Sequence, residues 1–168
     1  MGKKFLAAMN TSVRDVIQSA AYGLGLVAQY APAQFKEILP ATIEALAKVI
    51  QEKDSRSEEK AIATECAIGA VGKIVLFNYD GGIVGQTMVQ QYLALLPLKA
   101  ESEEAQNVHR LFFKSIIGKH QVLLLPANIP AVKDAIARIH DTAKAEPALE
   151  IIKTEDVPLL EQCINLLK

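Results

Sequence analysis

Residues 11–30 read TSVRDVIQSAAYGLGLVAQY, and this stretch decides the fold class because its apolar side chains recur every three to four positions. That spacing places them on one face of an α-helix. The members of the face are Val13, Val16, Ile17, Ala20, Ala21, Leu24 and Val27. Asn10 or Thr11 can cap the start of the helix, since a short side-chain oxygen accepts a backbone N–H of the first turn. The stretch therefore predicts an amphipathic helix over Thr11–Tyr30.

The same spacing continues through almost the whole chain, between prolines, glycines and short polar loops. Pro40 lies inside one of the segments, where a missing N–H and a clash with the preceding turn predict a kink. We expect helices over Pro32–Glu52, Ser57–Phe77, Val84–Leu96, Ser102–Lys119, Ile129–His140 and Asp156–Leu167, a turn at Asp80-Gly81-Gly82, and a weak segment around Pro147–Ile152. No stretch alternates apolar and polar residues at period two, so the predicted fold class is all-α.

The composition of the 168 residues agrees with helices and excludes several classes of protein. Hydrophobic residues make up 51% and aromatic residues only 5%, so the core must consist of small and aliphatic side chains, which favours packed helices over a β-sandwich. Eighteen basic residues face nineteen acidic ones, and we therefore expect no direct nucleic-acid partner. The apolar stretch Ala20–Ala31 is too short to span a bilayer, so no membrane insertion is expected. Cys66 and Cys163, 97 positions apart, suggest a reducing, intracellular compartment.

Two signals repeat at a nearly constant spacing. Ser57-Glu58-Glu59 and Ser102-Glu103-Glu104 are 45 positions apart, and Gly25 and Gly72 are 47 apart. Both spacings fall in the range of HEAT and armadillo repeats, in which each repeat is a pair of antiparallel helices. We therefore predict an α-solenoid of HEAT repeats in a right-handed superhelix, with a compact helical bundle as the alternative. The predicted array covers 1–168, with approximate units 3–30, 32–77, 84–119 and 121–167.

The beginning of the chain also bears on this prediction. In each repeat we call the two helices of the pair the first-position and the second-position helix, in chain order. Residues 3–9 look like the end of a first-position helix whose start is missing. Because solenoids normally end in polar caps, we expect the chain to be a fragment of a larger protein.

Several short segments together resemble one family of helical-repeat proteins. They are Ala20-Ala21-Tyr22-Gly23-Leu24-Gly25, Ala28-Gln29-Tyr30, Leu39-Pro40, Val49-Ile50-Gln51, Ala63-Thr64-Glu65-Cys66, Ala70-Val71-Gly72-Lys73-Ile74, Leu96-Pro97-Leu98 and Glu103-Glu104-Ala105. The series resembles the C-terminal part of the β-karyopherin, or importin-β, nuclear transport receptors, nearest to the importin-five or karyopherin beta-three branch. The resemblance runs from about Gln18 to Ile139.

The resemblance implies a nuclear import receptor that shuttles between cytoplasm and nucleus. Such a receptor binds protein cargo with basic localisation signals on its concave surface, is released by GTP-bound Ran, and contacts the phenylalanine–glycine repeats of FG-nucleoporins. Ran binds mainly to N-terminal repeats, which we expect this chain to lack. The alternative is a HEAT-repeat scaffold outside transport, such as a phosphatase regulatory or assembly subunit.

Two acidic pairs are the candidate site residues. Glu58, Glu59, Glu103 and Glu104 are predicted to begin second-position helices, where they would form an acidic ladder facing basic cargo. Carboxylates in a first helical turn are also explained by the helix dipole alone.

The remaining candidate residues give no sign of chemistry. His109, His120 and His140 have no metal-ligand spacing, and Gly23-x-Gly25 fits close helix packing better than a dinucleotide loop. We expect Phe112 to lie in the core and Phe113 at its rim. We therefore expect no catalytic residue, no metal, no cofactor and no enzymatic activity.

Overall fold

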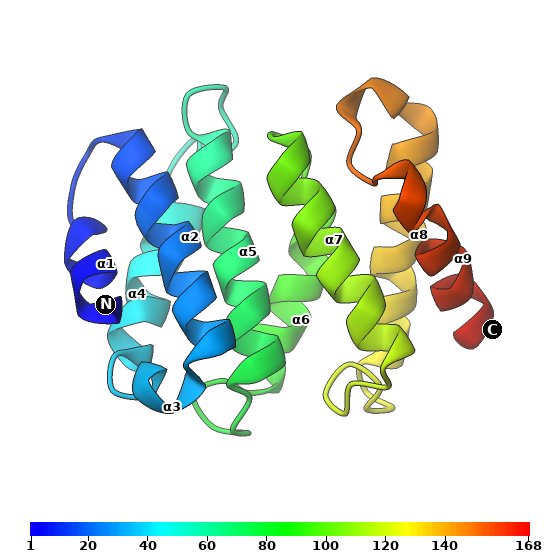
Figure 1. Ribbon diagram of the computed structural model, residues 1–168, viewed down its shortest axis with the longest axis horizontal. Helices are drawn as coiled ribbons and strands as arrows, with labels where there is room; N and C mark the ends of the chain where they lie inside the picture. The colour runs from blue at the N-terminus through cyan, green and yellow to red at the C-terminus, as the bar shows by residue number, and fades with distance from the viewer. The chain divides into compact units, whose positions relative to one another are not determined.

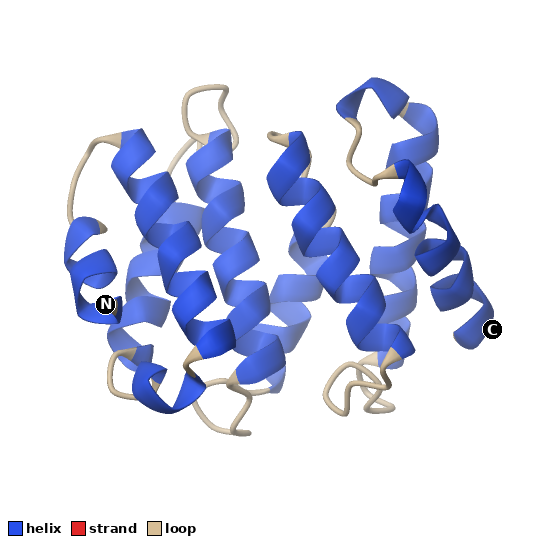
Figure 2. Ribbon diagram, viewed as in Figure 1, coloured by secondary structure: helices blue, strands red, loops and turns tan.

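A computed structural model describes all 168 residues, and it consists of helices and loops (Figures 1 and 2). The helices are α1 (Gly2–Ala8), α2 (Arg14–Tyr30), α3 (Pro32–Phe35), α4 (Leu39–Ile50), α5 (Ala61–Phe77), α6 (Gln86–Leu95), α7 (Ser102–Ile117), α8 (Ile129–Ala145) and α9 (Val157–Leu166), with 3₁₀ turns at Pro147–Leu149 and Thr154–Asp156. The predicted all-α class is confirmed. None of these helices has both the length and the apolar content needed to cross a membrane.

The helices form two compact units, Met1–Gly85 and Gln86–Lys168. In the first unit α2 lies along α5, while α1 packs on α2 and α4 packs on α5 (Figure 1). In the second unit α7 packs on α9 and α6 packs on α8. Each unit thus has a layer of first-position helices and a layer of second-position helices. This is the packing of HEAT-type helix pairs, as predicted, while the bounds of the single repeats remain predictions.

Proline and glycine explain where the helices of the first unit are interrupted. The expected kink at Pro40 is instead a break between α3 and α4, and Pro40 lies in the first turn of α4. A proline in that position sacrifices no helical hydrogen bond, because the N–H groups of a first turn have no partner. The turn at Asp80 is confirmed: its Oδ1 accepts from Gly82 N and Val84 N, at 2.8 and 3.0 Å, and Gly81 has a φ of +74°.

Two predicted helix starts are wrong by several residues. The cap of α2 is Val13, and neither Asn10 nor Thr11 bonds to a first-turn N–H of the helix; Thr11 Oγ1 accepts from Val13 N instead, at 3.2 Å. Helix α5 begins at Ala61 rather than Ser57, because residues 57–60 form a polar turn that has no apolar face to bury. At the other end of the chain, α8 continues five residues past the predicted end at His140.

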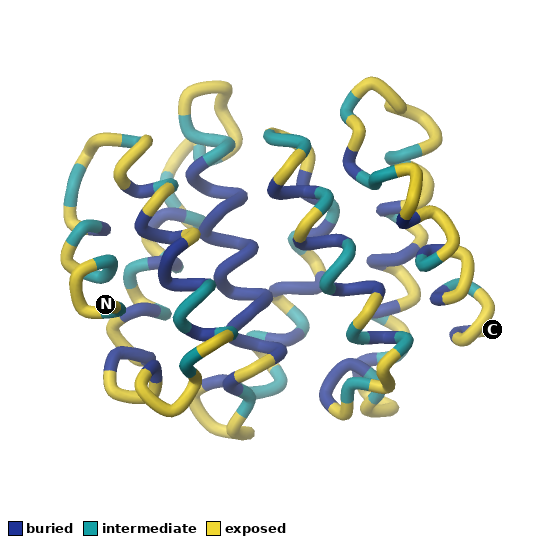
Figure 3. The backbone as a smooth tube through the Cα atoms, in the orientation of Figure 1, coloured by how far each residue is buried: buried dark blue, intermediate teal, exposed yellow.

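Helix α5 forms the centre of the first unit and is buried from Ala63 to Leu76 (Figure 3). Gly25 of α2 permits the close approach of the two helices, because an added Cβ would lie 3.1 Å from the Ala70 Cα atom. The prediction that this glycine serves helix packing is confirmed. In the second unit Phe112 and Phe113 are both fully buried, so the expectation that Phe113 forms part of a rim is wrong.

Candidate binding surfaces

The four glutamates of the predicted acidic ladder differ in their accessibility. Glu58 and Glu59 are exposed in the turn before α5. The prediction that they lie in the helix is wrong. Glu103 and Glu104 do lie in the first turn of α7, which Glu101 caps by accepting both of their backbone N–H groups at 3.0 and 2.7 Å. Glu104 is buried, with 6% of its surface exposed. Its carboxylate is therefore not available to a partner, whereas the other three are exposed.

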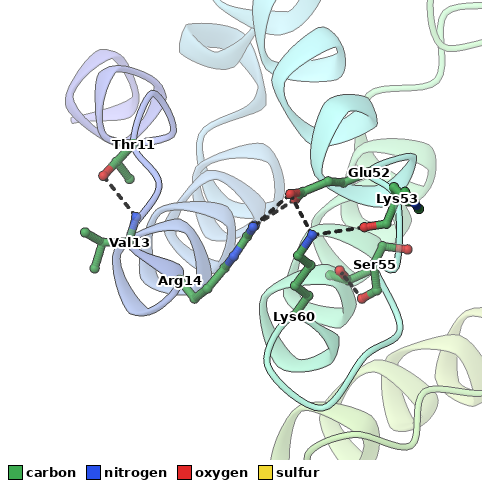
Figure 4. A network of polar contacts seen from close by, with 8 residues as sticks. Thr11, Val13, Arg14, Glu52, Lys53, Ser55 and Lys60 are labelled. Atoms are coloured by element: carbon green, nitrogen blue, oxygen red, sulfur yellow. Dashed lines mark hydrogen bonds and ion pairs between the residues drawn. The ribbon is translucent and has the colours of Figure 1, made fainter.

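A second polar cluster, unforeseen from the sequence, joins three segments of the first unit (Figure 4). Arg14, at the start of α2, donates to both carboxylate oxygens of Glu52 at 2.8 Å. Lys60 Nζ, in the turn before α5, donates to Glu52 Oε1 and to the carbonyl of Lys53, both at 2.9 Å. The hydrogen bonds from Arg14 and then Lys60 lower the pKa of Glu52 to about 2. Glu52 is thus held ionised between two cations.

A groove of about 480 Å³ runs beside this cluster between α1, α2 and α4. Met9, Ile17 and Val49 contribute an apolar floor and are nearly fully buried. The rim is polar, and its charges are already paired: Glu44 with Lys48 at 3.0 Å, and Glu52 with Arg14. Such a groove can accept an apolar side chain on its floor and a polar main chain at its rim. Because the charges of the rim are paired, the groove has little preference between acidic and basic ligands.

Two further grooves are more apolar. One, of about 560 Å³, lies between α1 and α2 and is lined by Phe5, Leu26, Val27 and the exposed Tyr30, among others. The other, of about 360 Å³, lies between α8 and α9 in the second unit, over Ile136 and Ile164. Each has the size and lining to take side chains of a protein partner.

In the second unit, α7 holds the segment that links α8 to α9. We call residues 147–156 the strap. Gln106 Nε2 donates to the carbonyl of Glu150 at 2.6 Å, and His109 Nδ1 donates to that of Ile151 at 2.9 Å. Arg110 Nε donates to both oxygens of Asp156 at 2.9 and 2.8 Å, and its NH2 group donates to Glu155 Oε1 at 2.6 Å.

His109 is the fully buried centre of this arrangement. Its Nε2 atom accepts from Leu98 N at 3.1 Å, so the ring proton is on Nδ1, which faces Ile151 O. Burial lowers the pKa of His109 to about 4, although the hydrogen bond to Ile151 acts in the opposite direction. The imidazole is therefore neutral and joins the loop after α6, helix α7 and the strap.

The other histidines and the cysteines do not form a site. His140 lies on the surface beside Asp141, 3.2 Å away, and Cys163 donates to the carbonyl of Phe113 at 3.4 Å. Burial raises the pKa of Cys163 to about 12. No three His, Cys, Asp or Glu side chains in the chain are placed to hold a metal ion.

The residues of these two clusters that the sequence did not predict have partners far along the chain. Arg14 and Glu52 are 38 positions apart, and His109 and Ile151 are 42 apart. The sequence does indicate the α7 side of the contact with the strap. Gln106, His109 and Arg110 are spaced i, i+3 and i+4, and they therefore share a helix face.

The chain has relatives among known proteins. The chain is similar to importin subunit beta-3 of the yeast Saccharomyces cerevisiae, with 28% identity over 120 residues. The aligned residues make up 71% of this chain but only 11% of the yeast protein. The chain therefore matches about a tenth of its relative's length. No protein-family model matches it. The similarity supports a relationship with the importin-β receptors and agrees with the resemblance carried by the segments between Ala20 and Ala105.

Proposed function

We propose that the chain is part of a nuclear import receptor of the importin-five, or karyopherin beta-three, branch. In this role it binds proteins and performs no chemistry of its own. The similarity to yeast importin subunit beta-3 carries the proposal. The layered helix pairs and the three grooves are compatible with it, because stacked helix pairs present extended surfaces to protein partners.

The proposed partners are those of such a receptor as a whole. They are protein cargo with basic localisation signals, the GTPase Ran, which would bind outside this chain, and FG-nucleoporins. The receptor would shuttle between cytoplasm and nucleus. Within this chain, Glu58, Glu59 and Glu103 are exposed carboxylates suited to basic cargo, and the two apolar grooves suit apolar side chains of a partner.

The decisive experiment uses the complete product of the gene that encodes this chain. Immobilised Ran loaded with a non-hydrolysable GTP analogue should retain it, whereas Ran loaded with GDP should retain much less. Failure to bind GTP-loaded Ran would contradict the transport proposal. Retention by a phosphatase catalytic subunit in a parallel experiment, with no Ran binding, would instead favour the scaffold alternative.

A cell-based assay gives an independent measurement. In permeabilised cells supplied with Ran and an energy source, the purified gene product should carry a fluorescent cargo with a basic signal into nuclei. A cargo whose basic residues are replaced by glutamine should stay outside. Equal accumulation of both cargoes would contradict recognition by charge.

A further inference from the structure

We infer that one face of α7 is a docking surface for an acidic peptide segment, and that the strap is its built-in occupant. An external peptide of this chemistry would bind by displacing the strap. The inference rests on contacts within the second unit and does not depend on the proposed role in nuclear transport.

The first argument is that α7 recognises the main chain of the strap. Gln106 and His109 donate to the carbonyls of two successive residues, Glu150 and Ile151, at 2.6 and 2.9 Å. Hydrogen bonds to main-chain carbonyls do not depend on the side chains of the bound segment, which is how many peptide-binding surfaces obtain affinity. Another segment whose main chain adopts the same local conformation could therefore accept the same two bonds.

The second argument is that two side-chain features supply specificity. Ile151 is the apolar anchor, with 1% of its surface exposed. Arg110 binds the carboxylates of Glu155 and Asp156 at 2.6–2.9 Å, and charge-assisted bonds of this kind are strong and directional. The pattern recognised is thus an aliphatic residue followed, four and five positions later, by two acidic residues.

The third argument is that half of the ten residues of the strap are exposed. Pro147, Ala148, Glu150, Thr154 and Glu155 are exposed. Glu150 has a φ of +48°, a left-handed conformation that is unfavourable for a residue other than glycine. Segments with few buried contacts open locally at a lower free energy than a whole domain.

The fourth argument is that α9 has its own attachment. Leu160 and Cys163 are buried, and the thiol of Cys163 bonds to the carbonyl of Phe113 on α7. Helix α9 can therefore remain packed on α7 while the strap opens. This makes the strap, rather than the whole C-terminal region, the element that an external peptide displaces.

A binding experiment tests the inference with a labelled synthetic peptide of the strap sequence, residues 146–158. The proteins are the full chain and a variant with Ile151→Ser and Asp156→Asn, in which the internal strap is weakened. The peptide should bind the variant at least ten times more tightly than it binds the unaltered chain. Adding Arg110→Gln to the variant should reduce binding by at least tenfold. Lys114→Gln, an exposed cation on the same helix, serves as the matched control and should change binding less than twofold.

Two results would overturn the inference. One is equal affinity of the peptide for the variant and the unaltered chain. The other is unchanged binding of a peptide in which the two residues that contact Arg110, Glu155 and Asp156, are replaced by their amides.

Hydrogen exchange on the unaltered chain tests the local opening that the inference requires, even where the variant does not fold. The hydrogen-bonded amides of Leu149, Glu150 and Asp156 should exchange at least tenfold faster than those in the middle of α9. Exchange of both sets at one common rate would show that the strap does not open alone, and the inference would fail.

Discussion

Two polar clusters, one in each unit, join three segments apiece, and they differ in the group at their centre. In the first unit the centre is the ionised carboxylate of Glu52, which lies between Arg14 and Lys60 and is partly exposed to water. In the second unit the centre is the neutral imidazole of His109, which is completely buried. A surface ion pair contributes little and is screened by salt, whereas a buried group must keep every hydrogen bond. The second unit should therefore depend much more on its central residue.

Replacing His109 with alanine should have the largest effect of the changes considered. It leaves a cavity and removes the partners of Leu98 N and Ile151 O, so the free energy of unfolding should fall by about 4 kcal/mol. Urea unfolding followed by circular dichroism measures the loss, and hydrogen exchange should locate it in residues 86–168. His140→Ala, at an exposed position, is the matched control and should change stability by less than about 0.5 kcal/mol. If His109→Ala also lowers the free energy of unfolding by less than about 0.5 kcal/mol, the second unit does not depend on its buried histidine.

Acid should destabilise the two units in different ranges of pH. The pKa of His109 is about 4 in the folded chain and 6.5 in its unperturbed state, so the unfolded chain binds the proton first as pH falls. The stabilisation of the folded chain that comes from the neutral ring is complete above pH 6.5. About 3 kcal/mol of it is lost as the pH falls from 6.5 to 4. The pKa of Glu52 is lowered from 4.5 to about 2, so its contribution is lost only between pH 4.5 and 2.

Hydrogen exchange at a series of pH values distinguishes these two losses. Residues 86–168 should lose protection before residues 1–85 as the pH is lowered. In a His109→Gln variant, which lacks the titrating ring, the loss between pH 6.5 and 4 should disappear. If the loss persists in that variant, the buried imidazole is not its cause.

Gly25 offers a test of the apolar contact on which the first unit depends. Gly25→Ala places a Cβ 3.1 Å from the Ala70 Cα, and the backbone of α2 or α5 must move to accommodate it. Overpacking of this kind outweighs the gain of about 1 kcal/mol in helix propensity, and we expect a net loss of about 1–2 kcal/mol. Urea unfolding of this variant is compared with Ser19→Ala, an exposed position on α2. A stabilised Gly25→Ala variant would mean that α2 and α5 pack less closely.

The sequence predicted helix positions better than helix ends or polar contacts. Helical spacing of apolar residues predicted all of the longer helices, because burial of one face is a local property of the sequence. The start of α5 was misplaced, since Ser57-Glu58-Glu59 resembles the first turn of a helix but forms a turn before it. The break before Pro40 was predicted only as a kink, because the spacing alone does not show whether a helix continues across a proline.

The candidate sites were less predictable than the helices for a physical reason. Spacing within one helix shows which side chains share a face, but not which distant residue they meet. For His109 the sequence therefore predicted only the lack of metal-ligand spacing, and not the bonds to atoms 11 and 42 positions away. Glu104 was assigned to the acidic ladder with Glu103, although neighbouring residues on a helix point in different directions and Glu104 is buried. The ladder formed by the other glutamates remains a prediction.

The smallest effect should come from the centre of the first unit. Arg14→Gln removes a bidentate bond to Glu52, but Lys60 continues to neutralise that carboxylate and water reaches it. The loss of stability should therefore be smaller than for Gly25→Ala. A double-mutant cycle with Glu52→Gln, measured by urea unfolding at low salt and at about 1 M salt, separates the interaction from the single substitutions. The coupling between the two residues should nearly vanish at high salt. A large coupling that salt does not reduce would mean that the Arg14–Glu52 pair acts as a buried pair, and the distinction between the two clusters would no longer hold.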